Sequence, residues 1–213
     1  MRAVPALLLW CLLLSGCGDT LWGELLPQPG IEFEAEPSGS TLRLIRRGRA
    51  SDAALVQETG ERRLWRTAGN QVVETDGGRI IATAGFPEML AATRFDGPDP
   101  LADPVALLTH PAAARRMVDL MRSSRKPEGM RFGIQVECRL RAEPTEDAAV
   151  LLVTERCRAE GAGRFTNLFW VSAESGAVLQ ATQWVGPEAP MLTIEFPLPR
   201  LAGDAPAGSS AGP

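Results

Sequence analysis

The chain has 213 residues, which is the size of one domain or of two small ones. Its 22 basic and 26 acidic side chains leave a formal net charge of −4, without the clustered positive charge expected of a nucleic-acid-binding protein. The single histidine, His110, excludes a zinc site built from several histidines and a catalytic pair of histidines. The 21 glycines and 17 prolines favour a turn-rich β protein over a helical bundle.

The first residues have the pattern of an export signal. Arg2 supplies a positive charge, and residues 3–14 form an apolar run that is too short for a membrane span of about 20 residues. The sequence Leu14-Ser15-Gly16-Cys17 resembles the lipobox of bacterial lipoproteins, which implies cleavage before Cys17 and acylation of its sulfur. We therefore expect a signal peptide over residues 1–16 and a lipidated tether over residues 17–30. An ordinary secreted protein whose signal happens to contain Cys17 is the alternative.

The residue after the cysteine bears on the choice of membrane. In enterobacteria an aspartate at that position favours the inner membrane, whereas this chain has Gly18 there. We therefore expect a protein anchored in the outer membrane and facing the periplasm, while Asp19 keeps the inner membrane open as the alternative. Within the tether, residues 21–26 are a candidate short helix that ends before Pro27.

From residue 40 onward, short apolar segments alternate with turns. Residues 40–84 predict a meander of about five short antiparallel strands. Pro87 is expected to begin a helical turn within residues 85–94, and proline-rich residues 95–104 are expected to form a loop. Residues 112–120 fit either a helix or a strand, and His110, which precedes Pro111, is expected in a surface turn.

The first of two predicted hairpins holds the last two cysteines. Residues 130–142 alternate apolar and polar side chains with the period of a half-buried strand, and residues 148–158 follow as its partner. Cys11 leaves with the signal peptide and Cys17 carries lipid, so Cys138 and Cys157 remain as a pair in an oxidising compartment. Folding the hairpin brings them together and predicts a disulfide. Two buried free thiols are the alternative.

The second predicted hairpin joins residues 165–173 to residues 177–184. Its first strand has apolar side chains on both faces, as in a strand that is covered on two sides: Phe165, Phe169 and Val171 share one face with Asn167, and Leu168 and Trp170 share the other. A last strand is expected at residues 191–196, and residues 198–213 are expected to be disordered. The predicted fold is thus all-β, a single antiparallel barrel-like or sandwich domain of meandering hairpins over residues 31–197, with at most short helices.

Three segments of this domain carry motifs, in order, over residues 64–187. The first runs from Leu64-Trp65-Arg66 through Gly78-Arg79-Ile80 to Gly85-Phe86-Pro87. The second is Asp96-Gly97-Pro98-Asp99-Pro100-Leu101, and the third runs from Asn167-Leu168-Phe169-Trp170-Val171 to Gln183-Trp184-Val185-Gly186-Pro187. Together with the lipobox, they resemble the YjbF/GfcB (YmcC-like) family of outer-membrane lipoproteins. The chain departs from the family pattern at Ser172, a usual acidic position, and at Ala181, near a usual basic one.

The resemblance implies an all-β, barrel-like domain and a role in exopolysaccharide or group 4 capsule production, with no known enzyme activity. It implies partners among the envelope proteins of the same export route, or the polymer itself. On this basis we expect a non-enzymatic accessory factor in polysaccharide assembly or export that requires no cofactor.

The residues themselves offer little catalytic chemistry. The sequence has no G-x-S-x-G elbow and no G-x-x-x-x-G-K-[ST] phosphate loop, and its 26 acids cannot be paired into a glycosidase site from sequence. We therefore expect no catalytic, cofactor-binding or metal-binding residues. Trp65, Trp170 and Trp184 could stack on sugar rings, but their place in strand patterns favours the core. A carbohydrate-binding or polysaccharide-trimming module remains the alternative function.

Overall fold

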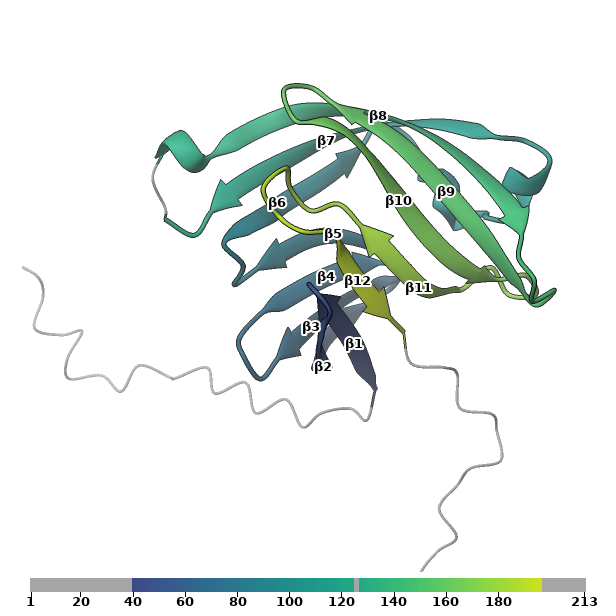
Figure 1. Cartoon of the computed structure of the whole chain (residues 1–213), viewed down its shortest axis with the longest axis horizontal. Coiled ribbons are helices and arrows are strands. Elements are labelled where there is room, and N and C mark those ends of the chain that lie inside the picture. Colours follow the sequence, from purple (N-terminus) through teal and green to yellow (C-terminus); the bar gives the residue numbers. More distant parts are fainter. Residues whose placement is uncertain (1–39, 125–126, 197–213) are drawn as a thin grey trace, which may run out of the picture. The chain divides into compact units, whose positions relative to one another are not determined.

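The computed structural model describes residues 40–124 and 127–196. In these ranges the chain forms twelve β-strands and three short 3-10 helices, with no α-helix and hence no helix that could cross a membrane. The strands belong to one antiparallel sheet that curls into a nearly closed barrel (Figure 1), which confirms the predicted all-β, barrel-like domain. The expected signal peptide, the tether with Cys17 and the C-terminal tail lie outside the described residues.

The first five strands form the meander that the sequence predicts, because each strand pairs with the next one along the chain. They are β1 (Thr41–Arg46), β2 (Arg49–Thr59), β3 (Arg62–Thr67), β4 (Val72–Asp76) and β5 (Arg79–Ala84). Glycine occupies the tight turns that need a left-handed backbone, with φ of 61° at Gly60 and 54° at Gly77.

The other strands form the second half of the barrel. They are β6 (Glu88–Phe95), β7 (Ala112–Arg122), β8 (Arg131–Pro144), β9 (Val150–Ala159), β10 (Gly163–Ser172), β11 (Val178–Gln183) and β12 (Leu192–Glu195). Each pairs with the next, and β12 pairs with β1, which joins the two halves. The short helices η1 (Pro100–Ala102), η2 (Ala106–Leu108) and η3 (Pro127–Gly129) lie in the loops before and after β7.

The two edges of the sheet, β5 and β6, are consecutive in the chain. Between the described residues of these strands there is no backbone ladder, but the N–H of Leu90 donates to Oγ1 of Thr83 over 2.9 Å. The expected helical turn after Pro87 is therefore wrong, because β6 begins at Glu88 and pairs with β7 along its length. The gain from the ladder and from burying Leu90, which is 3% exposed, outweighs the local preference of the proline.

The undecided residues 112–120 belong to strand β7. Their inward positions alternate with exposed ones, and Ala114, Val118 and Leu120 are buried in the core. This period-2 pattern is that of a strand covered on one face, but Arg116 interrupts its apolar side. The interruption explains why the pattern is ambiguous in the sequence.

The core fills the inside of the barrel and draws on almost every strand. Its most deeply buried side chains include Leu42, Leu44, Trp65, Val153, Phe169, Val171 and Ile194. The predicted disulfide between Cys138 and Cys157 lies inside as well, because the two residues are directly opposite each other on β8 and β9. It closes a loop of the size that contributes about 3 kcal/mol in the chain-entropy model.

Candidate functional site

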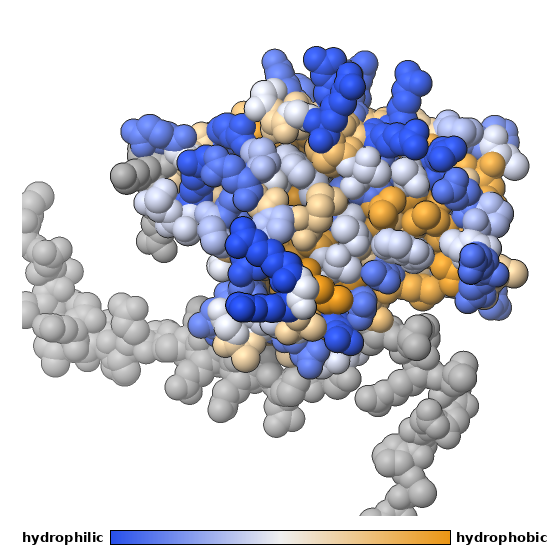
Figure 2. All heavy atoms as spheres, in the orientation of Figure 1, coloured by the Kyte–Doolittle hydropathy of each residue, from blue (hydrophilic) through white to orange (hydrophobic). Residues whose placement is uncertain are grey.

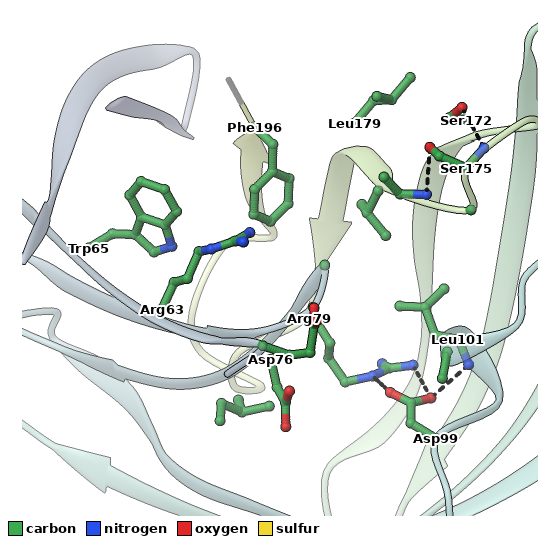
Figure 3. A pocket seen from close by; sticks show the side chains of 18 of the residues that line it. Arg63, Trp65, Asp76, Arg79, Asp99, Leu101, Ser172, Ser175, Leu179 and Phe196 are labelled. Atoms are coloured by element: carbon green, nitrogen blue, oxygen red, sulfur yellow. Dashed lines mark hydrogen bonds and ion pairs between the residues drawn. The ribbon is translucent and has the colours of Figure 1, made fainter. Parts of the chain in front are cut away.

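One end of the barrel is hollowed by a groove of about 1670 Å³ (Figure 3), which we call the barrel mouth. The turns after β2, β4, β8 and β10 and the loop after β6 surround it. Alternate connections of an antiparallel barrel fall at the same end, which is why these loops meet. Ser40 and Phe196, where the described domain begins and ends, also line the mouth.

The rim and walls of the mouth differ in polarity. Glu58, Arg63 and Asp76 give the rim its charge, and Arg63 Nε donates to Glu58 Oε1 over 2.7 Å. The half-buried side chains of Leu179 and Phe196 line the wall (Figure 3). The mouth therefore combines an apolar wall with a charged rim.

Four charged side chains form an ionic cluster at the inner side of the mouth. Arg79, the first residue of β5, donates from Nε and Nη2 to the two carboxylate oxygens of Asp99 over 2.5 and 3.1 Å. Its Nη1 donates to Oε2 of Glu155 over 3.0 Å. On the other side, Nη1 of Arg116 donates to Oε1 of Glu155 over 2.7 Å. Glu155 thus joins two arginines that come from β5 and β7.

Neutral side chains complete the cluster. Nδ2 of Asn167 donates to Oε2 of Glu155 over 2.6 Å, and Oδ1 of Asn167 accepts from the N–H of Trp184 over 2.8 Å. The Arg79 guanidinium also lies 5.2 Å from the ring centroid of Phe95 and 5.0 Å from that of Phe169, within the range of cation–π attraction. These contacts hold the guanidinium in one position.

A glycine lets β5 approach the opposite wall. A Cβ atom built on Gly78 would lie 2.1 Å from Cβ of Val178 on β11, so only glycine fits there. Next to it, Oε1 of Gln183 accepts from the N–H of Ile80 over 3.2 Å. The edge strand β5 is therefore tied to β11 across the interior, which places Arg79 within reach of Glu155.

The surroundings of the cluster shift the pKa values of its charged side chains. Burial alone raises the pKa of Glu155, but Arg79 and Arg116 outweigh it and bring the pKa down to about 2. Burial lowers the pKa of Arg79, yet the carboxylates of Glu155 and Asp99 hold it above its ordinary value. The pKa of Arg116 falls below its ordinary value, because burial and the nearby Arg79 charge outweigh the attraction of Glu155.

Two arginines and two carboxylates balance, so the cluster is neutral as a unit. Glu155, Arg79 and Arg116 are 0%, 2% and 6% exposed, which leaves water little access to them. An ionised buried carboxylate with this many donors binds its neighbours firmly and has no proton to give at neutral pH. The arrangement can brace the barrel and shape the mouth, and Glu155 is not the protonated acid that hydrolysis of a glycoside needs.

The three tryptophans lie in different surroundings. Trp65 is 2% exposed, and its Nε1 donates to Oγ1 of Thr75 over 3.1 Å inside the barrel. Trp184 is half-buried against the core and stacks on Phe165 with ring centroids 4.4 Å apart. Trp170 is half-buried on the outer face of β10, because its neighbours Phe169 and Val171 point inward. The expectation that all three tryptophans pack in the core therefore fits Trp65 and Trp184, but it does not fit Trp170.

Three further expectations concern His110, a metal site and Cys17. His110 is exposed and its Nδ1 lies 2.8 Å from Oγ1 of Thr109, in agreement with a surface turn. Cys138, Cys157 and Glu155 have ligand-type atoms within 4.8 Å of one another, but the disulfide occupies both sulfurs and arginines occupy the carboxylate. Lipidation of Cys17 stays a prediction.

Sequence reasoning missed the ionic cluster, although part of the signal was present. Arg79, Asp99 and Asn167 each belong to a different one of the three motif segments, and the fold brings them together. Arg116 and Glu155 lie outside these segments. Their signal is a charged side chain at an inward-facing strand position, where an apolar residue is expected.

Comparison with known proteins gives one family and one fold. The family described as group 4 capsule polysaccharide lipoprotein gfcB, YjbF matches residues 36–196, which covers every strand of the barrel. The crystal structure of the hypothetical lipoprotein YmcC from Escherichia coli (K12) is similar, with 22% identity, a TM-score of 0.62, and coverage of 75% of this chain and 85% of that one. At this identity the likeness shows the fold alone. No curated protein matches the chain.

Proposed function

Because the chain belongs to the YjbF family of group 4 capsule polysaccharide lipoproteins, we propose that it is a non-enzymatic accessory factor in the assembly or export of a surface polysaccharide. It acts through contacts with other envelope proteins while lipid on Cys17 holds it in the outer membrane, facing the periplasm. The family match over residues 36–196 carries this proposal, since it spans the whole described domain.

The ionic cluster supports a role without catalysis. A glycosidase of the usual kind needs a protonated carboxylic acid and a second carboxylate on either side of the bond that is cleaved. Glu155 is buried with a pKa of about 2, and Asp99 accepts two hydrogen bonds from Arg79. Glu155 therefore does not have the raised pKa of a general acid. We therefore favour contact over turnover, and set the polysaccharide-trimming alternative aside.

The barrel mouth is the surface that we assign to a protein partner. Its apolar wall contains Leu55, Val178, Leu179 and Phe196, which are half-buried and together can take apolar side chains of a partner segment. Glu58, Glu61, Asp76 and Glu174 outnumber Arg63 around the opening, so a segment with basic residues fits best.

Site-specific cross-linking in cells tests this assignment. A photoreactive phenylalanine analogue at Leu179, in the mouth, is expected to capture an envelope protein after irradiation. The control position is Phe132, which is 67% exposed on β8 and does not line the mouth. Equal capture from both positions, or from neither, contradicts the mouth as the contact surface. Unchanged surface polysaccharide after deletion of the gene contradicts the function itself.

The anchor has its own test. The substitution Cys17→Ser removes the only sulfur at the predicted lipidation site, so the protein is expected in the soluble periplasmic fraction. Fractionation followed by a high-salt wash checks this outcome, with the substitution Ser15→Ala as the control that keeps a small residue before the cysteine. A Cys17→Ser protein that stays with the membrane contradicts lipid anchoring.

A further inference from the structure

An unusual set of arginines lies on the outer face of β8, β9 and β10. Arg139 on β8 lies directly opposite Arg156 on β9, and Arg158 on β9 lies directly opposite Arg164 on β10. All four are exposed. Like charges at directly opposite positions destabilise a sheet, so the fold gains nothing from either pair.

None of these four arginines is held in an ion pair in the described part of the chain, although Glu137 on β8 lies directly opposite Arg158 on β9. Among residues 40–124 and 127–196, none of the four makes an ion pair or a side-chain hydrogen bond. The neighbouring Glu137 already pairs with Arg115 over 3.5 Å, and Glu143 pairs with Arg141 over 3.3 Å. We call the set of Arg115, Arg139, Arg141, Arg156, Arg158 and Arg164 the arginine face.

The arginine face is positively charged, although the whole chain has a negative net charge. Its six arginines exceed the neighbouring Glu137, Glu143 and Glu160 by three charges, whereas the whole chain has a formal net charge of −4. Figure 2 shows hydrophilic side chains projecting from the surface formed by β8 and β9. Chain-wide composition conceals this cluster, since acidic residues elsewhere outweigh it.

An apolar strip continues the same face toward the barrel mouth. Trp170 on β10 lies directly opposite Leu152 on β9, and Leu168 points to the same side. All three are half-buried, and Figure 2 shows a hydrophobic area over β9 and β10. Along β10 the distance from Arg164 to Trp170 is six residues, or about 20 Å at the usual rise of a strand. This length is sufficient for several sugar units of a linear polymer.

We propose that this outer face binds an acidic polysaccharide. The guanidinium groups of Arg139, Arg156, Arg158 and Arg164 take the carboxylate or phosphate groups of the polymer, which their fork of donors fits in bidentate fashion. Trp170 then stacks on a sugar ring at the other end of the strip. The proposal rests on the proposed function, because the polysaccharide class comes from the family, while the acidic character and the residues come from the structure.

Two of the arginines lie at the end of the barrel that is opposite to the mouth. The described domain begins at Ser40 and ends at Phe196, and both residues line the mouth. Arg158 and Arg164 flank the β9–β10 turn at residues 160–162, at the opposite end of the barrel. These two arginines therefore lie at the end of the barrel opposite to Ser40 and Phe196.

A binding experiment with two double variants tests the proposal. Full-length lipidated protein in detergent is titrated with polygalacturonate as the acidic probe and with dextran as the neutral one. We expect binding of polygalacturonate alone, and a loss of affinity of tenfold or more in the variant Arg139→Gln/Arg156→Gln. The matched control, Arg62→Gln/Arg66→Gln, removes two exposed arginines of β3 and should bind like the wild type.

Three results would overturn binding of an acidic polysaccharide at this face. The first is equal affinity of the two double variants, and the second is equal binding of dextran. The third is binding of a DNA duplex or of anionic phospholipid vesicles as tightly as polygalacturonate, because the face is then a general site for polyanions. Loss of surface polysaccharide on gene deletion, together with unchanged polygalacturonate binding by Arg139→Gln/Arg156→Gln, retains the proposed function and rejects this face.

Discussion

Arginine serves opposite purposes inside and outside this barrel. In the ionic cluster, Arg79 and Arg116 are almost fully buried, and each donates to a carboxylate. On the arginine face, Arg139 and Arg156 are exposed, lie opposite each other and have no such partner in the described part of the chain. A buried guanidinium without a carboxylate is costly, whereas an exposed one is stabilised by water. The buried arginines therefore stabilise the fold, and the exposed arginines are available to bind an anionic ligand.

The substitution Arg79→Ala should show the largest effect on this contrast. It leaves Asp99 without its arginine and Glu155 with Arg116 as its remaining arginine, so we expect a loss of about 3–5 kcal/mol in the free energy of unfolding. The control Arg62→Ala removes an arginine that is 60% exposed and should cost less than about 1 kcal/mol. Urea unfolding of both variants checks this, and equal costs would contradict the structural role of the cluster.

Loss of the disulfide should come next. The substitution Cys157→Ser breaks the link between β8 and β9 beside the cluster, and we expect the free energy of unfolding to fall by about 3 kcal/mol. Treatment of the wild type with a reductant should lower the free energy of unfolding by a similar amount, and the melting temperature should fall with it. A melting temperature that does not respond to reductant contradicts the bond.

The low pKa of Glu155 predicts a specific acid sensitivity. Because the folded protein binds the proton less readily than the unfolded chain does, the carboxylate contributes its full stabilisation above about pH 4.5. This contribution is lost as the pH falls from 4.5 toward 2, where the folded protein also takes up the proton. The free energy of unfolding, measured across this pH range, should change less with pH in Glu155→Gln than in the wild type, because the variant lacks the titrating group.

Two tryptophan substitutions sharpen the comparison between the inside and the outside. The change Trp184→Ala removes a ring that packs on the core and on Phe165, so we expect a cost of about 2 kcal/mol, roughly half that of a fully buried ring. The change Trp170→Ala on the outer face should cost less and should weaken binding of polygalacturonate. Thermal melting and titration of both variants separate the two roles. A larger loss of stability in Trp170→Ala than in Trp184→Ala, with weaker polygalacturonate binding only in Trp184→Ala, would contradict these two roles.

The smallest expected effect has the opposite sign. Removal of the opposed charges in Arg139→Gln/Arg156→Gln should leave the melting temperature unchanged or raise it slightly, since a like-charge pair costs at most about 1 kcal/mol. The gain should shrink with added salt, which screens exposed charges. A clear loss of stability would show that these arginines support the fold.

Local pattern was enough to predict most of the strands. Period-2 alternation with turn signals located β1 to β5 and both hairpins, because a strand with one buried face must alternate and a left-handed turn position favours glycine or asparagine. The pairing of Cys138 with Cys157 followed from the same hairpin. Pattern failed at β6, where a bond to Thr83 and a partner strand replace the helical turn expected after Pro87. Those contacts come from other parts of the chain.

The sequence by itself therefore determined the all-β class, most strands, the disulfide and, through its motif segments, the family. Only the tertiary structure decided which charges meet. Arg79 and Glu155 are 76 residues apart and become neighbours when the barrel closes, and Arg116 and Glu155, which are 39 residues apart, meet from β7 and β9. Such neighbours depend on strand order and register, which long-range pairing sets and local alternation does not encode.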